Sequence, residues 1–253
     1  MVKMIGKVSR GSRMDQIYIP KNRQALPVGS YVEIRPLETE ERESKLYFYN
    51  IANLEPIKTE IIKDIMKTID QHMINENIMV TGSFLDRGFR FNDIDIMVIT
   101  ESKTSIDEAL EKKLKIKVHL ITLSKKELMK GLSTDPMFSV MLSRCVAKKR
   151  FIHMVKTKIN KKLLDMRLLK SKPLIDSFDL LTGNEKYAML RNLIAIRRFI
   201  DKKEVGLNAV DSAIRKLFGS IDKLKENMIP RKDFQKKYRK IFNDTQRKII
   251  QYQ

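Results

Sequence analysis

The stretch that most constrains the fold spans residues 80–100 and reads VTGSFLDRGFRFNDIDIMVIT. An apolar run ends in the Gly-Ser pair 82–83, and after nine further residues an Asp-Ile-Asp sequence opens a second apolar run. Side chains two positions apart on a strand lie on the same face, so Asp93 and Asp95 are expected to share one face while Ile94 points into the core from the other. The chain therefore has to build a buried strand that bears two neighbouring carboxylates.

Predicted strands and helices alternate around this stretch. Residues 57–75 place isoleucine and methionine at the three- and four-residue spacing of an amphipathic helix. Ser124, followed three residues later by Glu127, is a capping-box signature for the start of another helix. Further strands are predicted at 78–81, 94–100 and 116–123, with a helix at about 105–114, and residues 45–54 either extend the sheet or link onward. This alternation predicts a small α/β domain over residues 55–143.

The paired carboxylates predict a metal site. Two adjacent carboxylates repel each other unless a cation lies between them, and a ligand set made only of oxygen favours Mg²⁺ or Mn²⁺ over Zn²⁺. Gly82 lets the backbone approach a ligand closely, and Ser83 with neighbouring N–H groups can hold a phosphate. Together these residues suggest phosphoryl or nucleotidyl transfer. The plainer alternative is an Asp-x-Asp in a turn or on a surface strand, but isolated acids seldom lie in so apolar a run without a partner.

The arrangement Gly-Ser-x9-Asp-h-Asp-h after an apolar strand, where h is any apolar residue, resembles the signature of the DNA polymerase β-type nucleotidyltransferase superfamily over roughly residues 58–125. The resemblance implies a mixed-sheet α/β core that binds an NTP, transfers its NMP to an acceptor hydroxyl and releases pyrophosphate. It also implies that Gly82 and Ser83 contact the phosphates of the nucleotide. Asp93 and Asp95 would hold the divalent ions, Mg²⁺ or Mn²⁺.

His119 marks a departure from that pattern. The superfamily has a third carboxylate on a neighbouring strand, whereas the stretch KIKVHLITL contains no acid and has His119 at the corresponding place. A neutral imidazole can take a proton from the acceptor hydroxyl or ligate a metal ion. Alternatively, His119 is structural in a domain that binds a nucleotide without turning it over. Arg87 and Arg90, in the loop between the two motifs, either neutralise triphosphate charge or serve solubility.

The N-terminal residues 4–36 read as short strands separated by turn residues, which predicts a small β module. Their pattern resembles the AbrB/SpoVT-like swapped-hairpin domain at Ile17, Ile19, Pro20, Arg23, Gly29, Val32 and Ile34. In that family two chains interleave their hairpins, so the resemblance implies a homodimer. Many members bind DNA through basic residues, for which the local candidates are Lys7, Arg10, Arg13, Lys21 and Arg23. Alternatively, the module packs on its own chain. With both motifs, the chain resembles predicted nucleotidyltransferases of archaea that have an AbrB-like N-terminal module.

The formal charge of +20 is unevenly distributed. Residues 144–253 contain 29 Lys and Arg against 11 Asp and Glu, whereas residues 1–143 contain 22 against 20. A localised basic surface attracts polyanions, of which nucleic acid is the commonest. A solvated helix surface and an anionic membrane surface are the alternatives. The pattern is helical from about Pro136 onward, so a basic α-helical domain is expected over residues 144–253.

Two helical stretches of this domain mix basic and aromatic residues. The first contains Tyr187, and its arginines face either nucleic acid or water: Arg191, Arg197 and Arg198. In residues 230–240, PRKDFQKKYRK, Phe234 and Tyr238 would suit stacking on single-stranded bases. With Ile241 they also have the spacing of a helix core, which is the interpretation we favour.

The sequence as a whole predicts an α+β fold in three parts: a β module over 1–54, a nucleotidyltransferase domain over 55–143 and a basic helical domain over 144–253. The single cysteine, Cys145, excludes an intramolecular disulfide and a cysteine-based zinc cluster, and it fits a reducing cytoplasm. No stretch has the roughly 18 apolar residues of a membrane span, and the N-terminus lacks a signal-like apolar segment. A cytoplasmic protein without a membrane partner is expected.

Three functions follow from these features. The first is a metal-dependent nucleotidyltransferase whose acceptor is the end of an RNA, with RNA favoured over DNA as the nucleic-acid partner. The second is a DNA-binding regulator with a catalytically weak nucleotide-binding domain. The third is an antitoxin-like transferase that AMPylates a protein hydroxyl, although a protein acceptor does not require the basic C-terminal domain.

Overall fold

The computed structural model describes residues 8, 9, 16, 17, 27, 29, 45–102, 105–151 and 155–251. The chain divides into two compact units, Met1–Glu43 and Ser44–Gln253. In the first unit, β1 (Val8–Ser9) pairs antiparallel with β2 (Gln16–Ile17), in agreement with the short strands expected there. Most of the residues on which the AbrB-like prediction depends lie outside the described residues: Lys7, Arg10, Arg13, Ile19, Pro20, Lys21, Arg23, Val32 and Ile34.

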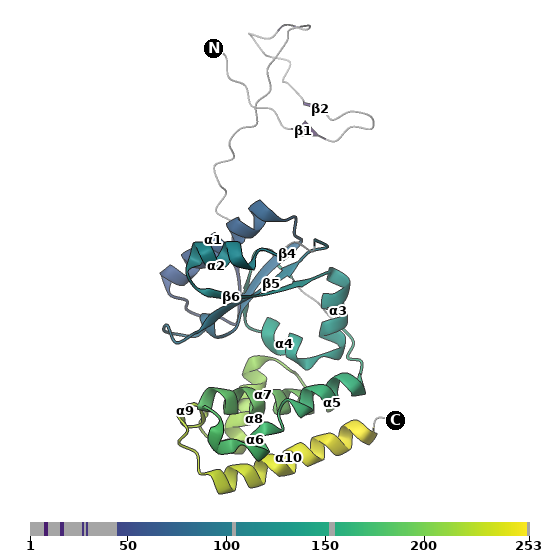
Figure 1. Ribbon diagram of the computed structural model, residues 1–253. Helices are drawn as coiled ribbons and strands as arrows, with labels where there is room; N and C mark the ends of the chain where they lie inside the picture. The colour runs from purple at the N-terminus through teal and green to yellow at the C-terminus, as the bar shows by residue number, and fades with distance from the viewer. Residues whose placement is uncertain are drawn as a thin grey trace. The chain divides into compact units, whose positions relative to one another are not determined.

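The second unit contains a five-stranded mixed sheet (Figure 1). Its strands are β3 (Tyr47–Tyr49), β4 (Asn77–Thr81), β5 (Asp93–Ile99), β6 (Lys117–Leu123) and β7 (Cys145–Ala147). The strand order is β3-β7-β4-β5-β6, with β5 and β6 parallel and every other pair antiparallel. The predicted α/β character and the strands before and after the Gly-Ser pair are therefore confirmed, and residues 47–49 do extend the sheet.

The prediction of a helical pattern from Pro136 onward is wrong at β7. Its three residues are fully buried and pair with both β3 and β4. A run this short shows neither the alternation of a half-buried strand nor the length of a typical strand, so the sequence contains no strand signal there. The sheet thus includes residues before 55 and after 143.

Helices cover both faces of the sheet (Figure 1). On one face, α1 (Pro56–His72) and α2 (Asp107–Leu114) pack on the even-numbered core residues of β4 and β5, such as Ile96. On the other face, α3 (Lys125–Thr134) and α4 (Pro136–Leu142) pack on odd-numbered residues, such as Met97. The predicted capping box at Ser124 and Glu127 is present at the start of α3.

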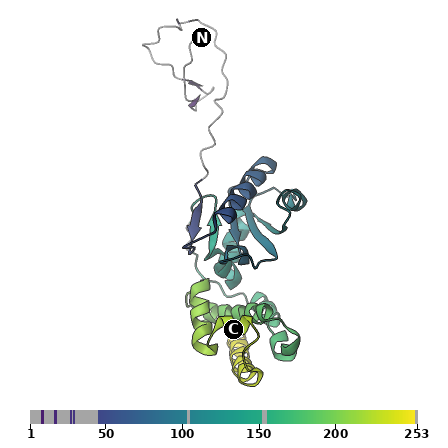
Figure 2. The ribbon, with the colours of Figure 1, turned by 90° about the vertical axis from the view of Figure 1, so that its left-hand side faces the viewer.

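The remaining residues form a helical part with its own core (Figures 1 and 2). Its elements are α5 (Lys161–Leu169), α6 (Pro173–Asp176), the 3-10 turn η2 (Phe178–Leu180), α7 (Gly183–Ile200), α8 (Leu207–Phe218), α9 (Ile221–Lys225) and α10 (Arg231–Gln251). Helix α7 is central because it contacts α4, α5, α8, α9 and α10. In the described ranges, none of the helices combines the length and the apolar character that a membrane span requires.

Helix α4 belongs to both cores. Its Val140 lies in the core of the helical part, while its Leu142 lies in the sheet core. A hydrogen bond reinforces this link. The N–H of Leu207, the first residue of α8, donates to Oγ of Ser143, which lies between α4 and β7, at 2.8 Å. The basic helical part is therefore tied to the sheet through the segment that precedes β7.

Candidate active site

The two carboxylates lie together at the start of β5. Ile94 and Ile96 are fully buried, while Asp93 and Asp95 are half-buried. Because odd-numbered residues of β5 share one face, both aspartates lie on the same face as Met97, as predicted. The hydrophobic core of that face begins only at Met97, so the carboxylates occupy its polar end.

Gly82 is the residue that makes room for Asp95. It follows β4 directly, and the last residue of β4, Thr81, is paired with Asp95 in the sheet. Gly82 has φ +83° and ψ −164°, a conformation that residues with a Cβ rarely adopt. A Cβ at this position would also collide with Asp95 Oδ2. Ser83 follows as the exposed first residue of the 3-10 turn η1 (Ser83–Leu85).

His119 lies beside Asp95 on the neighbouring strand. The parallel pairing of β5 and β6 places the two residues in register, and His119 Nδ1 is 3.1 Å from Asp95 Oδ1. The imidazole donates this hydrogen bond when Nδ1 is protonated, and its side chain is 63% exposed. The structure therefore brings together Asp93, Asp95, His119 and Gly82, four of the residues selected from the sequence.

The donor set fits a metal ion that arrives with a substrate. Over the described ranges, no group of three or more His, Cys, Asp or Glu side chains is arranged to hold a metal ion. Mg²⁺ is commonly bound by only one or two carboxylates, with substrate phosphates and water completing its six ligands. In the same ranges neither Asp93 nor Asp95 forms an ion pair with lysine or arginine. Two available carboxylates on one face are compatible with Mg²⁺ or Mn²⁺ that a triphosphate also ligates.

A buried lysine holds the loop between the two motifs. Lys58, on the first turn of α1, has no exposed surface, and its Nζ donates to Asp86 O and Gly88 O at 2.5 Å each. Its ion-pair partner Glu55 is 3.1 Å away. The Gly88 N–H donates to Glu55 Oε1 at 2.6 Å, which is the main reason that the pKa of Glu55 falls to about 2. We call Lys58 and Glu55 the loop clamp.

Sequence reasoning missed the loop clamp, although a signal was present. Lys58 lies four residues before Ile62, on the apolar stripe of α1, where a charged residue requires a buried partner. Arg87 and Arg90, which were predicted to contact triphosphate, are both exposed on the clamped loop. Within the described ranges, neither arginine forms an ion pair with Asp93 or Asp95.

Among the residues that the structure describes, none supplies a third carboxylate to the site. Asp86, the acid of the loop between Ser83 and Asp93, forms an ion pair with Arg144, and Arg144 also donates to Leu85 O. Glu101 follows the opposite end of β5. Asp107 lies at the start of α2, where it accepts a hydrogen bond from Ser105. His119 is therefore the residue that occupies the place beside Asp95.

The aromatic residues of α10 belong to the core. Phe234, Tyr238 and Ile241 are buried, and Tyr238 donates to Ser171 O at 2.7 Å. The favoured interpretation of these residues is confirmed, and the alternative that Phe234 and Tyr238 stack on bases is wrong. Tyr187 is also engaged within the protein, since it is half-buried and donates to Asp211 Oδ1 at 2.7 Å. Burial raises the pKa of the Tyr187 hydroxyl.

The opposite side of α10 is a basic stripe. Five of its exposed residues are basic and recur at helical spacing: Lys232, Lys236, Arg239, Lys240 and Arg247. In the described part of the chain the first four have no acidic partner, while Arg247 is 3.1 Å from Asp244. Like charges three or four residues apart destabilise a helix. We call these five residues the basic stripe; it is about 22 Å long at 1.5 Å per residue.

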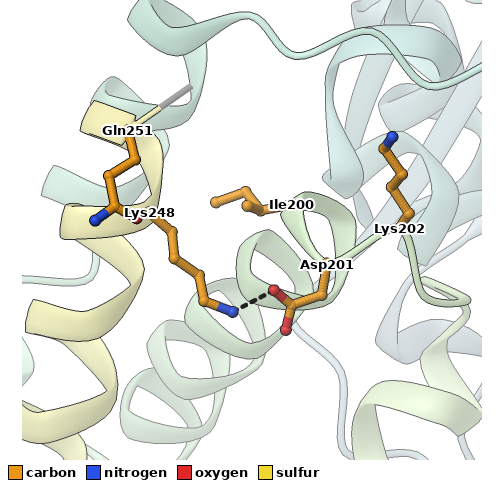
Figure 3. Close-up of a pocket in the computed structure, with 5 residues that line it drawn as sticks. All are labelled: Ile200, Asp201, Lys202, Lys248 and Gln251. Carbon is orange, nitrogen blue, oxygen red and sulfur yellow. Dashed lines mark hydrogen bonds and ion pairs between the residues drawn. The ribbon is translucent and has the colours of Figure 1, made fainter. Parts of the chain in front are cut away.

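A pocket of about 400 Å³ lies elsewhere, between the ends of α7 and α10 (Figure 3). It is lined by Ile200, Asp201, Lys202, Lys248 and Gln251. Its carboxylate, Asp201, forms an ion pair with Lys248 across the pocket, as the dashed line in Figure 3 shows. Since it contains none of the residues described above, this pocket does not coincide with the carboxylate site.

Comparison of the chain with known protein families, with curated proteins and with solved structures finds no match. The chemistry of the carboxylate site consequently has to be inferred from its own residues.

Proposed function

We propose that the chain is a metal-dependent nucleotidyltransferase. The strongest support is the close approach of the Asp95 carboxylate to Gly82, at the end of β4. Only a residue without a Cβ leaves room for this carboxylate. Asp93 lies on the same face as Asp95, and His119 is in register with Asp95. These side chains suit a site for a divalent cation and a triphosphate. The resemblance of the Gly-Ser-x9-Asp-h-Asp pattern to the polymerase β-type superfamily agrees with this proposal.

Each residue then has a distinct role. Asp93 and Asp95 would hold Mg²⁺ or Mn²⁺, which supplies charge neutralisation of the triphosphate and lowers the pKa of the attacking hydroxyl. Gly82 and Ser83 would contact the phosphates, with Arg87 and Arg90 adding positive charge from the loop.

His119 is the proposed general base. When Nδ1–H donates to Asp95, Nε2 is the nitrogen that can accept a proton. As the acceptor oxygen forms its bond to the α-phosphorus, its proton passes to Nε2. The bond from the α-phosphorus to the bridging oxygen breaks, and pyrophosphate leaves with that electron pair.

The basic stripe of α10 is the proposed binding surface for the acceptor, an RNA. Like charges along the stripe weaken the helix, and a polyanion would neutralise them. By resemblance to the AbrB family, we also propose that the N-terminal module makes the protein a homodimer; the pairing of Val8–Ser9 with Gln16–Ile17 is compatible with its first hairpin. Light scattering on the full chain tests the dimer, and a monomer would refute it.

The proposed activity is tested with NTPs radiolabelled at the α-phosphate, Mn²⁺ and total RNA. We expect label on RNA with the natural chain and a loss of at least about a hundredfold with Asp93→Ala, since even changes behind a metal ligand lower activity 10- to 100-fold. Absence of transfer together with footprinting of duplex DNA would replace the proposal with the DNA-binding regulator. Label on a co-purifying polypeptide would instead identify a protein-modifying transferase.

A further inference from the structure

Phe89 is an exposed aromatic residue on the loop between Ser83 and Asp93. It is 61% exposed, although large apolar side chains are normally buried. Arg87 and Arg90, on either side of it along the chain, are exposed as well. Nothing in the proposed roles of Gly82, Ser83 and the carboxylates requires an aromatic ring here.

Lys58 of the loop clamp contacts this ring. Lys58 Nζ lies 5.2 Å from the centroid of the Phe89 ring, a cation–π contact. The same ammonium donates to the carbonyls of Asp86 and Gly88, so the loop is fixed just before Phe89. After it, Phe91 packs edge-to-face on the buried Phe84, with ring centroids 5.0 Å apart. The loop is therefore fixed on both sides of Phe89, and this ring remains exposed on a fixed support.

We propose that Phe89, on the loop that leads from Ser83 to Asp93, is a stacking platform for a nucleobase. The inference rests on the proposed function and specifies how the nucleotide is bound. An exposed aromatic ring offers a π-face to any base, and arginines beside it can neutralise the phosphates joined to that base. The buried lysine keeps the ring in place, so little conformational freedom is lost when a base stacks on it.

The stacked base belongs either to the incoming NTP or to the end of the acceptor strand. Both present the same aromatic face, so both are tested. An exposed phenylalanine can also be a protein contact, and this is the competing explanation.

The chain contains no tryptophan, so Phe89→Trp creates a single fluorescent reporter on the loop. Phe48→Trp is the matched control, because Phe48 is likewise exposed, at 44%, but lies on the edge strand β3. Each variant is titrated with a non-hydrolysable ATP analogue and Mn²⁺, with inorganic triphosphate and Mn²⁺, and with a short single-stranded RNA.

We expect quenching of the Phe89→Trp fluorescence by the ATP analogue or by the RNA, with no quenching by inorganic triphosphate and none in Phe48→Trp. Quenching by the analogue identifies the NTP as the source of the base, and quenching by RNA alone identifies the acceptor. Equal changes in both variants, or no change with either ligand, would overturn the proposal. A response that depends on protein concentration in the absence of ligand would establish the protein contact instead.

A second readout separates this inference from the proposed function. Phe89→Ala is expected to weaken binding of the base-bearing ligand about 5- to 150-fold, the range found for one base–aromatic stack, while Phe89→Tyr restores it. If label transfer by the natural chain is present and Phe89→Ala binds as tightly, stacking is refuted and the transferase stands. If transfer is absent but Phe89→Trp is quenched by the analogue, the catalytic proposal fails and stacking stands.

Discussion

Replacing Gly82 by alanine tests whether this glycine positions Asp95. Two effects are expected from the structure. With φ +83° and ψ −164°, Gly82 lies in a region essentially restricted to glycine, so an added Cβ costs about 1–3 kcal/mol of backbone strain. For a unit of this size, each kcal/mol lowers Tm by about 2–4 °C, so a fall of about 2–12 °C is expected.

The second effect is local. Because the new Cβ would collide with Asp95 Oδ2, the carboxylate has to move away from its present position beside His119. We expect the affinity for Mn²⁺ with a bound nucleotide analogue to fall about 10- to 100-fold, as for other changes that displace a metal ligand. Calorimetry gives Tm, and isothermal titration gives the metal affinity.

Gly219→Ala is the matched control. Gly219, at the C-terminal end of α8, has a similar conformation, φ +86° and ψ −132°, but no atom lies within 4 Å of an added Cβ. It should lower Tm by a comparable amount and leave Mn²⁺ binding unchanged. If Gly82→Ala lowers Tm yet binds Mn²⁺ as tightly as Gly219→Ala, Gly82 does not position Asp95 as a metal ligand.

Three further changes test other parts of the structure. The folded-state pKa of Glu55, about 2, lies below its ordinary 4.5, so ionised Glu55 stabilises the fold above pH 4.5 and this stabilisation is lost as pH falls towards 2. The urea midpoint of Glu55→Gln should therefore depend less on pH in that window than the midpoint of the natural chain. An unchanged dependence would contradict the loop clamp. His119→Asn can still hydrogen-bond to Asp95 but cannot accept a proton, so we expect Mn²⁺ binding to persist while transfer rates fall about a hundredfold or more. Full activity of this variant would exclude His119 as the general base. The double variant Lys236→Glu with Lys240→Glu reverses two charges, so the negative slope of log K against log salt for RNA binding should become less steep by about 2. Lys223→Glu on α9 should leave this slope unchanged. Equal slopes in both variants would exclude the basic stripe from the acceptor site.

The strands around the carboxylates could be predicted because their signals are local. Apolar runs bounded by Gly82 and by Asp93 indicate strands, and Ser124 with Glu127 indicates a helix start within four residues. The shared face of Asp93 and Asp95 follows from the period of a strand alone. Their proximity to His119 follows from parallel pairing, which the intervening helix α2 makes the expected connection.

The loop clamp and β7 could not be predicted because they depend on distant partners. Lys58 bonds to carbonyls 28 and 30 residues away, and backbone oxygens leave no trace in a sequence. β7 is recognised as a strand only through its pairing with β3 and β4. The role of Arg144 likewise appears only once Asp86 lies beside it. Lys58, on the apolar stripe of α1, indicates an unusual environment, but only the fold identifies its partners.

The proposed function depends most on one property of the site: Asp93 and Asp95 together bind a divalent cation that a triphosphate also ligates. Its most direct test is electron paramagnetic resonance of Mn²⁺ titrated into the protein with a non-hydrolysable ATP analogue, in the natural chain and in Asp93→Asn with Asp95→Asn. We expect bound Mn²⁺ with the natural chain, loss of that signal in the double variant and an unchanged Tm. Equal uptake of Mn²⁺ by both proteins, or none by either, would contradict the proposed function.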